Sequence, residues 1–253
     1  MRQMIPATLF VLSCACMCAT MEAQAPKQKK NDAVLPLERK DKNSVNLHNK
    51  FLGIAKEGKV DVLFLGDSIT QGWAGSGKEA WKKTFEPLKA ANFGIGGDRT
   101  QHVIWRITEG KELEGINPKV AVMMIGTNNA GGNSATEIAD GIKEIVSILR
   151  KQKPSMKILL LGVFPRGGKN PKLFKDPMKA AATELNPKIK QINDILASTS
   201  WDKDVQYLDI GSKFLDSDGA LEKGIMPDFL HLSSKGYEIW TEAIEGKVKE
   251  MLK

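Results

Sequence analysis

Cysteine is nearly absent from this 253-residue chain, and its three copies are crowded together near the N-terminus, at Cys14, Cys16 and Cys18. A chain that loses this segment has no cysteine at all. That excludes disulfides, thiolate metal sites and cysteine nucleophiles, and an oxidising compartment poses no redox hazard to the folded domain. Histidine is equally scarce, with three residues in the whole chain, so few side chains can act as a general base.

No stretch of the chain is apolar for long enough to favour a stable membrane span. Residues 4–21 carry no charge, but proline, serine and threonine interrupt them. A basic residue precedes this stretch and alanines follow it, which is the order of a secretory signal peptide. We therefore expect a signal peptide over residues 1–23 and a secreted or periplasmic protein. Two alternatives are a membrane anchor and a lipoprotein attached through Cys14 or Cys16.

Acidic residues are outnumbered, with 30 Asp and Glu against 37 Lys and Arg, which gives a net charge of +7. The densest run of lysine falls in a polar, proline-containing stretch, and this composition predicts a basic disordered linker over residues 24–43. One domain over residues 44–253 follows. A basic nucleic-acid-binding arm is the alternative, but no basic motif interleaved with aromatic residues supports it. We therefore expect no nucleic-acid partner.

Short apolar runs alternate with amphipathic stretches beyond residue 60. The runs read as strands, three of them buried on both faces, at residues 60–65, 89–93, 120–125, 158–163 and 205–208. Helical periodicity appears at residues 138–149, 189–196 and 237–251, the last two behind Asn186-Pro187 and Ser233 as helix-start signals. This alternation predicts an α/β fold with a five-stranded parallel sheet covered on both faces.

Polar clusters follow the first three predicted strands, where ligands of open parallel sheets bind. They are Gly66-Asp67-Ser68, Gly94 to Asp98 and Gly126 to Asn129, and a fourth cluster, Asp228 to His231, precedes the last helix. Each cluster alone is weak evidence, because such residues commonly form turns and helix caps. Their combination in this order favours a functional site.

A serine nucleophile can be assembled from these clusters. A serine hydroxyl needs a base to take its proton. Of the histidines, His48 lies in the polar entry segment and His102 in a predicted helix, which leaves His231 in a loop. Asp228 is three residues earlier, near enough to hold the imidazole Nδ1–H as in a Ser-His-Asp triad with Ser68.

Acyl transfer also needs hydrogen-bond donors for the developing oxyanion. Gly97 can offer a backbone N–H, Asn128 a side-chain amide, and Ser68 its own backbone N–H at a helix start.

Two nucleotide-binding motifs are present only in part. Glu79 replaces the Ser or Thr of a P-loop after Lys78, and Arg99 replaces the last glycine of a dinucleotide fingerprint. We expect no cofactor and no metal.

The ordered set resembles the SGNH (GDSL) hydrolase family over residues 45–252. Leu63 to Ser68 looks like the family's first block, Gly97 falls on the second, Asn128 on the third and Asp228 to His231 on the last. The chain is most similar to the catalytic subunits of the intracellular (type Ib) platelet-activating-factor acetylhydrolases. That similarity rests on three stretches, Asn92 to Thr100, His102 to Arg106 and Asp228 to Leu232.

The resemblance implies a three-layer α/β/α sandwich, flavodoxin-like in type, and a metal-free esterase that favours short acyl groups. It makes Ser68 the nucleophile, His231 the base and Asp228 the residue that orients the base, with Gly97 and Asn128 in the oxyanion hole. Many members of the broad family have Asp after that last residue, where this chain and the acetylhydrolase branch have Asn. The predicted signal peptide departs from the intracellular branch, so the lipid substrate is not carried over.

The expected function is hydrolysis of short-chain, chiefly acetyl, carboxylic esters by a secreted serine esterase. Export suggests O-acetylated carbohydrate as the substrate. A lysophospholipase or arylesterase is the alternative within the enzyme class. A catalytically inactive SGNH domain that binds glycans is the alternative outside it, and the intact Ser68, Asp228 and His231 argue against that reading. The expected partner is a small-molecule or glycan ester, and a homodimer stays open.

Overall fold

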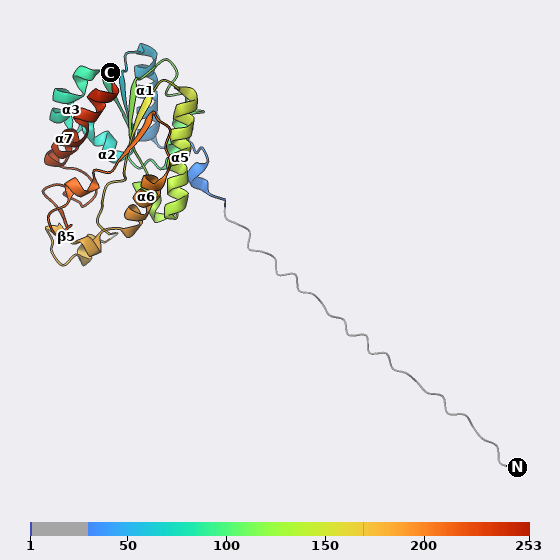
Figure 1. Ribbon diagram of the computed structural model, residues 1–253, viewed down its shortest axis with the longest axis vertical. Coiled ribbons are helices and arrows are strands. Elements are labelled where there is room, and N and C mark those ends of the chain that lie inside the picture. Colours follow the sequence, from blue (N-terminus) through green and yellow to red (C-terminus); the bar gives the residue numbers. More distant parts are fainter. Residues whose placement is uncertain (2–29, 169) are drawn as a thin grey trace. The chain divides into compact units, whose positions relative to one another are not determined.

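The five predicted strands form one parallel sheet (Figure 1). A computed structural model of the protein describes Met1 and residues 30–168 and 170–253, and the facts below concern these residues. The strands lie in the order β2-β1-β3-β4-β6. Their bounds are β1 (Val62–Gly66), β2 (Ala90–Gly94), β3 (Val120–Met124), β4 (Lys157–Leu161) and β6 (Val205–Leu208). The predicted α/β fold with a five-stranded parallel sheet is confirmed.

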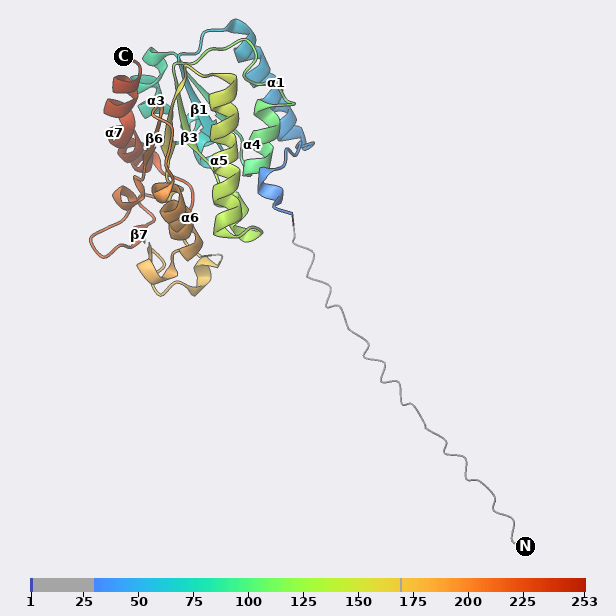
Figure 2. The ribbon, with the colours of Figure 1, turned by 45° about the vertical axis from the view of Figure 1, so that its right-hand side comes forward.

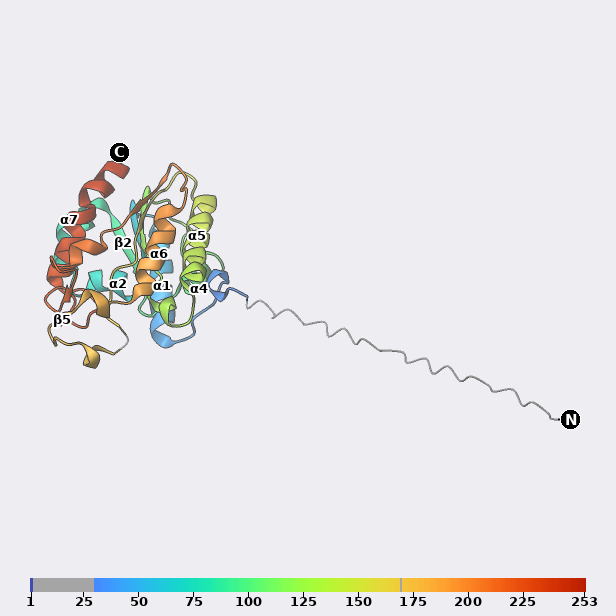
Figure 3. The same ribbon diagram turned by 60° about the horizontal axis from the view of Figure 1, so that its bottom comes forward.

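Helices cover both faces of the sheet (Figure 2). Their bounds are α1 (Lys42–Glu57), α2 (Ser68–Gln71), α3 (Lys78–Thr84), α4 (Thr100–Ile107), α5 (Ala135–Gln152), α6 (Pro187–Ser198) and α7 (Ser234–Met251). In Figures 2 and 3, α7 lies on one side of the strands and α1, α4 and α5 lie on the other. The three layers of the predicted sandwich are therefore present.

Alternation along each strand divides the buried side chains into two cores. Leu63 and Leu65 of β1 join an aliphatic core with α1, α4, α5 and α6. Val62 and Phe64, one position out of phase, join an aromatic-rich core with α7. Successive strand residues point to opposite faces, so a strand buried on both sides must be apolar at every position. That is why β1 and β3, whose residues are all buried, were visible in the sequence as unbroken apolar runs.

A second, two-stranded sheet had no sequence signal. β5 (Lys179–Ala180) pairs antiparallel with β7 (Leu221–Glu222) in a sheet of its own. Each strand has two residues, which is too short for any periodicity to appear. The pairing of chain segments far apart in sequence creates these strands.

The predicted disordered linker over residues 24–43 is wrong for its described second half. We call Asn31–Asp41 the N-terminal strap. Its Ala33 is fully buried, and the Ala33 carbonyl accepts a hydrogen bond from Thr100 Oγ1 at 2.7 Å. The Leu37 N–H donates to the Gln101 carbonyl at 3.0 Å. Composition failed here because polar contacts with α4 and α5, rather than apolar burial, hold the strap.

The predicted domain start at residue 44 also moves. Asp41 caps α1, accepting a hydrogen bond from the Ser44 N–H, and the helix begins at Lys42. His48 therefore lies on a helix rather than in an entry segment. The predicted signal peptide, apart from Met1, and residues 24–29 of the predicted linker lie outside the described residues. Among the helices described, none has the length and apolar character that crossing a membrane requires.

Candidate active site

The turn after β1 places Ser68 at the carboxyl edge of the sheet. Asp67 caps α2, and its Oδ1 accepts a hydrogen bond from the Ile69 N–H at 2.9 Å. Gly66 is required at the strand end, because a Cβ there would lie 2.2 Å from Thr70 Oγ1 and 2.4 Å from the Met124 carbonyl oxygen. The tight turn leaves Asp67 fully buried and Ser68 partly exposed at the first position of α2.

The structure brings Ser68, His231 and Asp228 together in one hydrogen-bonded chain. His231 Nε2 lies 2.9 Å from Ser68 Oγ, and His231 Nδ1 lies 2.7 Å from Asp228 Oδ2. The His231 and Asp228 side chains are 46% and 56% exposed, so this chain opens to solvent. The geometry is that of a nucleophile, a base and a group that orients the base.

The Asp228 carboxylate also fixes the backbone of the loop that leads to His231. Asp228 Oδ1 accepts hydrogen bonds from the Leu230 N–H at 3.0 Å and the His231 N–H at 2.7 Å. Partial burial opposes ionisation of Asp228, but these bonds and the His231 ring outweigh it and lower the pKa of the carboxyl. Asp228 is therefore ionised and turned toward Nδ1 at neutral pH.

The loop after β2 borders Ser68. A Cβ on Gly96 would lie 3.7 Å from the Ser68 Cβ. Gln71 ties the loop to α2, the helix that begins with Ser68, because its Oε1 accepts the Gly96 N–H at 2.7 Å. Gly97 is exposed with φ +81°, and within the described chain its N–H has no acceptor. We call Ile95–Asp98 the β2–α4 loop.

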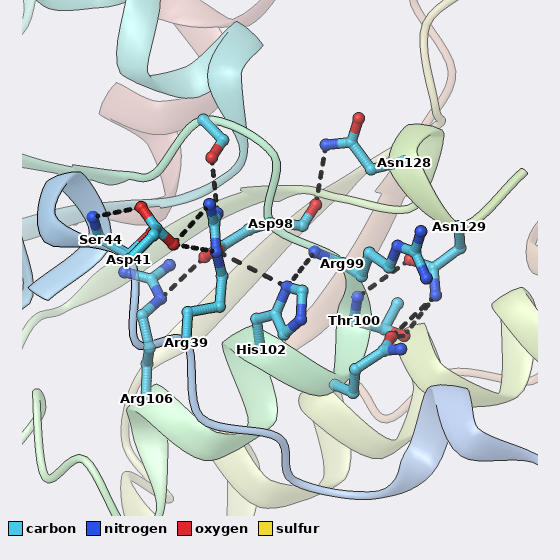
Figure 4. A network of polar contacts seen from close by, with 12 residues as sticks. Arg39, Asp41, Ser44, Asp98, Arg99, Thr100, His102, Arg106, Asn128 and Asn129 are labelled. Carbon is cyan, nitrogen blue, oxygen red and sulfur yellow. Dashed lines mark hydrogen bonds and ion pairs between the residues drawn. The ribbon is translucent and has the colours of Figure 1, made fainter. Parts of the chain in front are cut away.

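Asn128 closes the far side of the β2–α4 loop. Its Nδ2 donates to the Asp98 carbonyl at 2.9 Å (Figure 4). A side-chain amide has two N–H groups, so this bond fixes the amide plane and leaves a second donor. Asn129 differs completely: it is fully buried, and it holds the start of α4 by accepting the Thr100 N–H at 3.0 Å and donating to Gln101 Oε1 at 2.9 Å. The two adjacent asparagines therefore bind different parts of the structure, the carbonyl of Asp98 and the start of α4.

His102 is not available as a base. It lies in α4, and its Nδ1 accepts the Arg99 N–H at 3.0 Å. Burial and the neighbouring arginines Arg39, Arg99 and Arg106 lower the pKa of His102 to about 4. The ring is therefore neutral at pH 7 and serves as a helix cap.

Arg166 is a site residue that sequence reasoning missed. Its Nη1 donates to the Thr127 carbonyl and hydroxyl at 3.3 and 3.2 Å, beside Asn128. Burial lowers the pKa of Arg166, and the charges of Asp67 and Asp228 oppose this effect. The residue follows β4, so the strand-end rule that selected the other clusters could have found it.

Within the described residues, no three His, Cys, Asp or Glu side chains are grouped so that they could hold a metal ion. The polar groups gathered at this edge are the Ser68 hydroxyl, the His231 imidazole and the Asp228 carboxylate.

Comparison with known proteins places the chain in a family. Residues 64–239 match the model of the GDSL-like lipase/acylhydrolase family. The chain belongs to this family. The GDSL-like hydrolase is 43% identical over 197 residues to the platelet-activating factor acetylhydrolase IB subunit alpha2 of Rattus norvegicus, which covers 78% of this chain and 80% of that protein. It is 37% identical to the human subunit alpha1 over 210 residues, 82% of this chain and 84% of that protein.

Solved structures show the same GDSL-hydrolase fold. A protein from Streptococcus pneumonia, described as a putative platelet activating factor, has a TM-score of 0.66 at 21% identity over 84% of this chain and 94% of its own. A putative acylhydrolase from Bacteroides fragilis has a TM-score of 0.65 at 22% identity over 85% of this chain and 100% of its own. The SGNH resemblance predicted from the motifs is confirmed, and the protein is an acylhydrolase of this family.

Proposed function

We propose that this acylhydrolase is a serine esterase with Ser68 as nucleophile, His231 as general base and Asp228 as the residue that orients the base. One observation carries the proposal: the unbroken chain from Asp228 Oδ2 through both imidazole nitrogens to Ser68 Oγ, with steps of 2.7 and 2.9 Å. The carboxylate holds the proton on Nδ1, so Nε2 is the nitrogen free to accept the serine proton.

The reaction then proceeds through an acyl-enzyme. Ser68 Oγ attacks the ester carbonyl as its proton passes to His231 Nε2, and the protonated imidazole returns that proton to the leaving alcohol. The Gly97 N–H, the Ser68 N–H and the second N–H of Asn128 donate to the oxyanion. Water attacks the acyl group by the same route and regenerates Ser68.

The test of the nucleophile is Ser68→Ala, assayed with p-nitrophenyl acetate. We expect turnover to fall by about 10⁴- to 10⁶-fold with an unchanged melting temperature. The matched control is Ser234→Ala at the exposed start of α7, which should keep full activity. A Ser68→Ala variant as active as the wild type would remove the serine mechanism. A wild-type protein without any esterase activity would favour the inactive glycan-binding module.

Within this proposal, the substrate is a short-chain, chiefly acetyl, ester on carbohydrate outside the cell. The exposure of Asp228 and His231 supports a bulky polar substrate, because an acetyl group on a large glycan can reach Ser68 directly from solvent. The predicted signal peptide supports export. Release of acetate from a panel of acetylated glycans, with acyl-chain-length profiling on p-nitrophenyl esters, tests the substrate class.

A lipid ester is the second candidate, because the relatives at 43% and 37% identity are named platelet-activating factor acetylhydrolases. A phospholipid with an acetyl ester should then be hydrolysed with a higher kcat/KM than acetylated glycans. A higher kcat/KM on acetylated glycans would contradict the lipid candidate.

Mass spectrometry of the exported protein tests the predicted signal peptide separately. We expect an N-terminus at Gln24 rather than a lipid-modified Cys14 or Cys16.

A further inference from the structure

The guanidinium of Arg39 in the N-terminal strap lies against the β2–α4 loop (Figure 4). Its Nη1 donates to the Gly96 carbonyl at 2.6 Å and lies 3.1 Å from Asp98 Oδ1. A Cβ on Gly97 would lie 3.3 Å from the same nitrogen. A residue from the very start of the domain therefore touches the loop that carries a proposed oxyanion donor.

The contact with Gly96 has a specific electronic consequence. The Gly96 carbonyl and the Gly97 N–H belong to one peptide group. A hydrogen bond to the oxygen of a peptide polarises it and makes its N–H a stronger donor, and more so when the bond comes from a charged group. Arg39 thus binds the carbonyl oxygen of the peptide group that carries the Gly97 N–H. Within the described chain that N–H has no acceptor, so it is free to donate to an oxyanion.

Surrounding ion pairs hold Arg39 in this position. Its Nε and Nη2 lie 3.0 and 2.9 Å from Asp41 Oδ2, and Asp41 is itself the cap of α1. Asp98, which is fully buried, receives Arg39 on Oδ1 and Arg106 Nε on Oδ2 at 3.0 Å. Arg106 is anchored in turn by Glu112 at 2.9 Å. The guanidinium is therefore fixed before substrate arrives, as electrostatic catalysis requires.

The strap does not depend on Arg39 for its attachment. Asn31 Nδ2 donates to the Glu137 carbonyl at 3.2 Å, and Asp32 Oδ1 accepts from Asn133 Nδ2 at 2.6 Å. The buried Ala33 provides a further contact with α4. Loss of the Arg39 side chain removes its bond to the Gly96 peptide and leaves these fastenings intact.

We propose that Arg39 is a positioning residue for ester hydrolysis, which fixes and polarises the Gly96–Gly97 peptide so that the Gly97 N–H stabilises the oxyanion. This inference rests on the proposed function. Arg39 itself does not touch the reacting atoms. Its effect is confined to the transition state, because the oxyanion forms only there.

Kinetics of Arg39→Met and Arg39→Lys test the proposal. We expect Arg39→Met to lower kcat on p-nitrophenyl acetate about tenfold, less than the loss of a whole donor, with KM changed by less than about twofold. Arg39→Lys keeps the charge and can reach one acceptor, so it should recover part of the loss. Phenylboronic acid forms a tetrahedral anion on a serine, and its inhibition constant should rise in parallel with the fall in kcat.

Arg150→Met is the matched control. Arg150 is 19% exposed against 23% for Arg39. It contacts Asp202 and Asp204, and it donates to the carbonyls of Pro154 and Met156 at 2.7 and 2.8 Å, near the amino end of β4. Arg150→Met should lower the melting temperature as much as Arg39→Met does and leave kcat unchanged.

Three outcomes overturn the proposal: Arg39→Met with full kcat, equal losses of kcat in Arg39→Met and Arg150→Met, or no recovery in Arg39→Lys together with an unchanged inhibition constant for phenylboronic acid. Should Arg39→Met fail to fold, Arg39→Lys is judged against the wild type by the same kcat and boronate measurements. Ser68→Ala, assayed alongside, distinguishes failure of the serine mechanism from failure of the role of Arg39. If that variant is active, the serine mechanism fails. If it is inactive while Arg39→Met is fully active, only the role of Arg39 fails.

Discussion

Phe229 adopts a left-handed backbone conformation, with φ 57°, that is rare for a bulky residue. Such a conformation costs on the order of 1–3 kcal/mol and persists only where the surroundings impose it. Here the ring is buried and packs edge-on against Phe174 at 5.0 Å, and the Phe229 carbonyl accepts the Gly167 N–H at 2.8 Å. The turn so formed lets two side chains three residues apart, Asp228 and His231, face each other.

Asn128 is predicted to act on the transition state rather than on folding. Asn128→Ala removes one of three proposed oxyanion donors, so kcat should fall on the order of 10²- to 10³-fold with little change in KM. Melting temperature and kcat measured on one preparation check this. Asn129→Ala is the contrasting control, because it removes buried hydrogen bonds and should cost about 1–3 kcal/mol of stability. A destabilised but fully active Asn128→Ala variant would defeat the oxyanion role.

Because of Asp67, we expect the stability of the folded protein to depend on pH. Burial is the main cause that raises the pKa of Asp67 from 3.8 to about 7; Asp98 adds to it, and the Ile69 N–H, His231 and Arg166 oppose it. Between those values the folded protein holds a proton that the unfolded chain releases, so stability falls as pH rises through this range.

Asp67→Asn removes the titration and keeps an oxygen for the Ile69 N–H. The difference between the variant's melting temperature and that of the wild type should therefore shift in favour of the variant from pH 5 to pH 8. A difference that stays constant across this range would show that Asp67 keeps an ordinary pKa in the folded protein.

At the scale of elements, α7 holds in place α2, the helix that begins with Ser68. The Tyr237 hydroxyl donates to the Ile69 carbonyl of α2 at 2.6 Å. Gly72 makes room for it, since a Cβ there would lie 2.0 Å from that oxygen. The last helix of the fold is thus bonded to the turn that carries Ser68.

Tyr237→Phe should lower the free energy of unfolding by about 1–3 kcal/mol, because a buried carbonyl loses its partner. Urea unfolding measures this change. The other tyrosine of the chain, Tyr207, is the control: it is only partly buried and its hydroxyl donates to the Asn193 carbonyl at 3.4 Å. Equal effects of Tyr237→Phe and Tyr207→Phe would contradict the structural role of the Tyr237 bond.

Elements buried on both faces could be read from the sequence, and those held by polar contacts could not. The run that became β3 is apolar at every position because helices cover both its sides. By contrast, α1 was missed because few of its residues, Phe51 and Ala55 among them, are apolar and buried. The strap was missed for the same reason. Its bonds join residues far apart in sequence, both to backbone carbonyls and to side chains, and no local pattern records them.

The candidate site divides in the same way. Ser68, Gly97, Asn128, Asp228 and His231 all follow a strand or precede a helix, so topology alone could place them at one edge. The residues that hold these five in position have no comparable signal in the sequence. Arg39 reaches Gly96 across 57 positions of sequence, and Tyr237 reaches Ile69 across 168. Such pairings arise only when the layers pack.

For the whole molecule, the chemistry should need neither metal nor thiol. All three cysteines lie in the predicted signal peptide, and the described residues hold no group suited to a metal. EDTA and iodoacetamide should leave ester hydrolysis unchanged, whereas a serine-directed organophosphate should abolish it. The organophosphate adduct should appear by mass spectrometry in the wild type and be absent from Ser68→Ala. Strong inhibition by EDTA would point to a metal hydrolase instead.

The division of the interior into an aliphatic and an aromatic core also determines what spectroscopy will see. Of five tryptophans, Trp73, Trp81 and Trp240 lie on the aromatic side, with the rings of Trp73 and Trp240 4.8 Å apart. Intrinsic fluorescence and near-ultraviolet circular dichroism will therefore report mainly on the half of the protein that contains α7. Loosening of the opposite face, beneath α5, will show first in the far-ultraviolet helix signal. A mismatch between the two melting curves would locate the weaker layer.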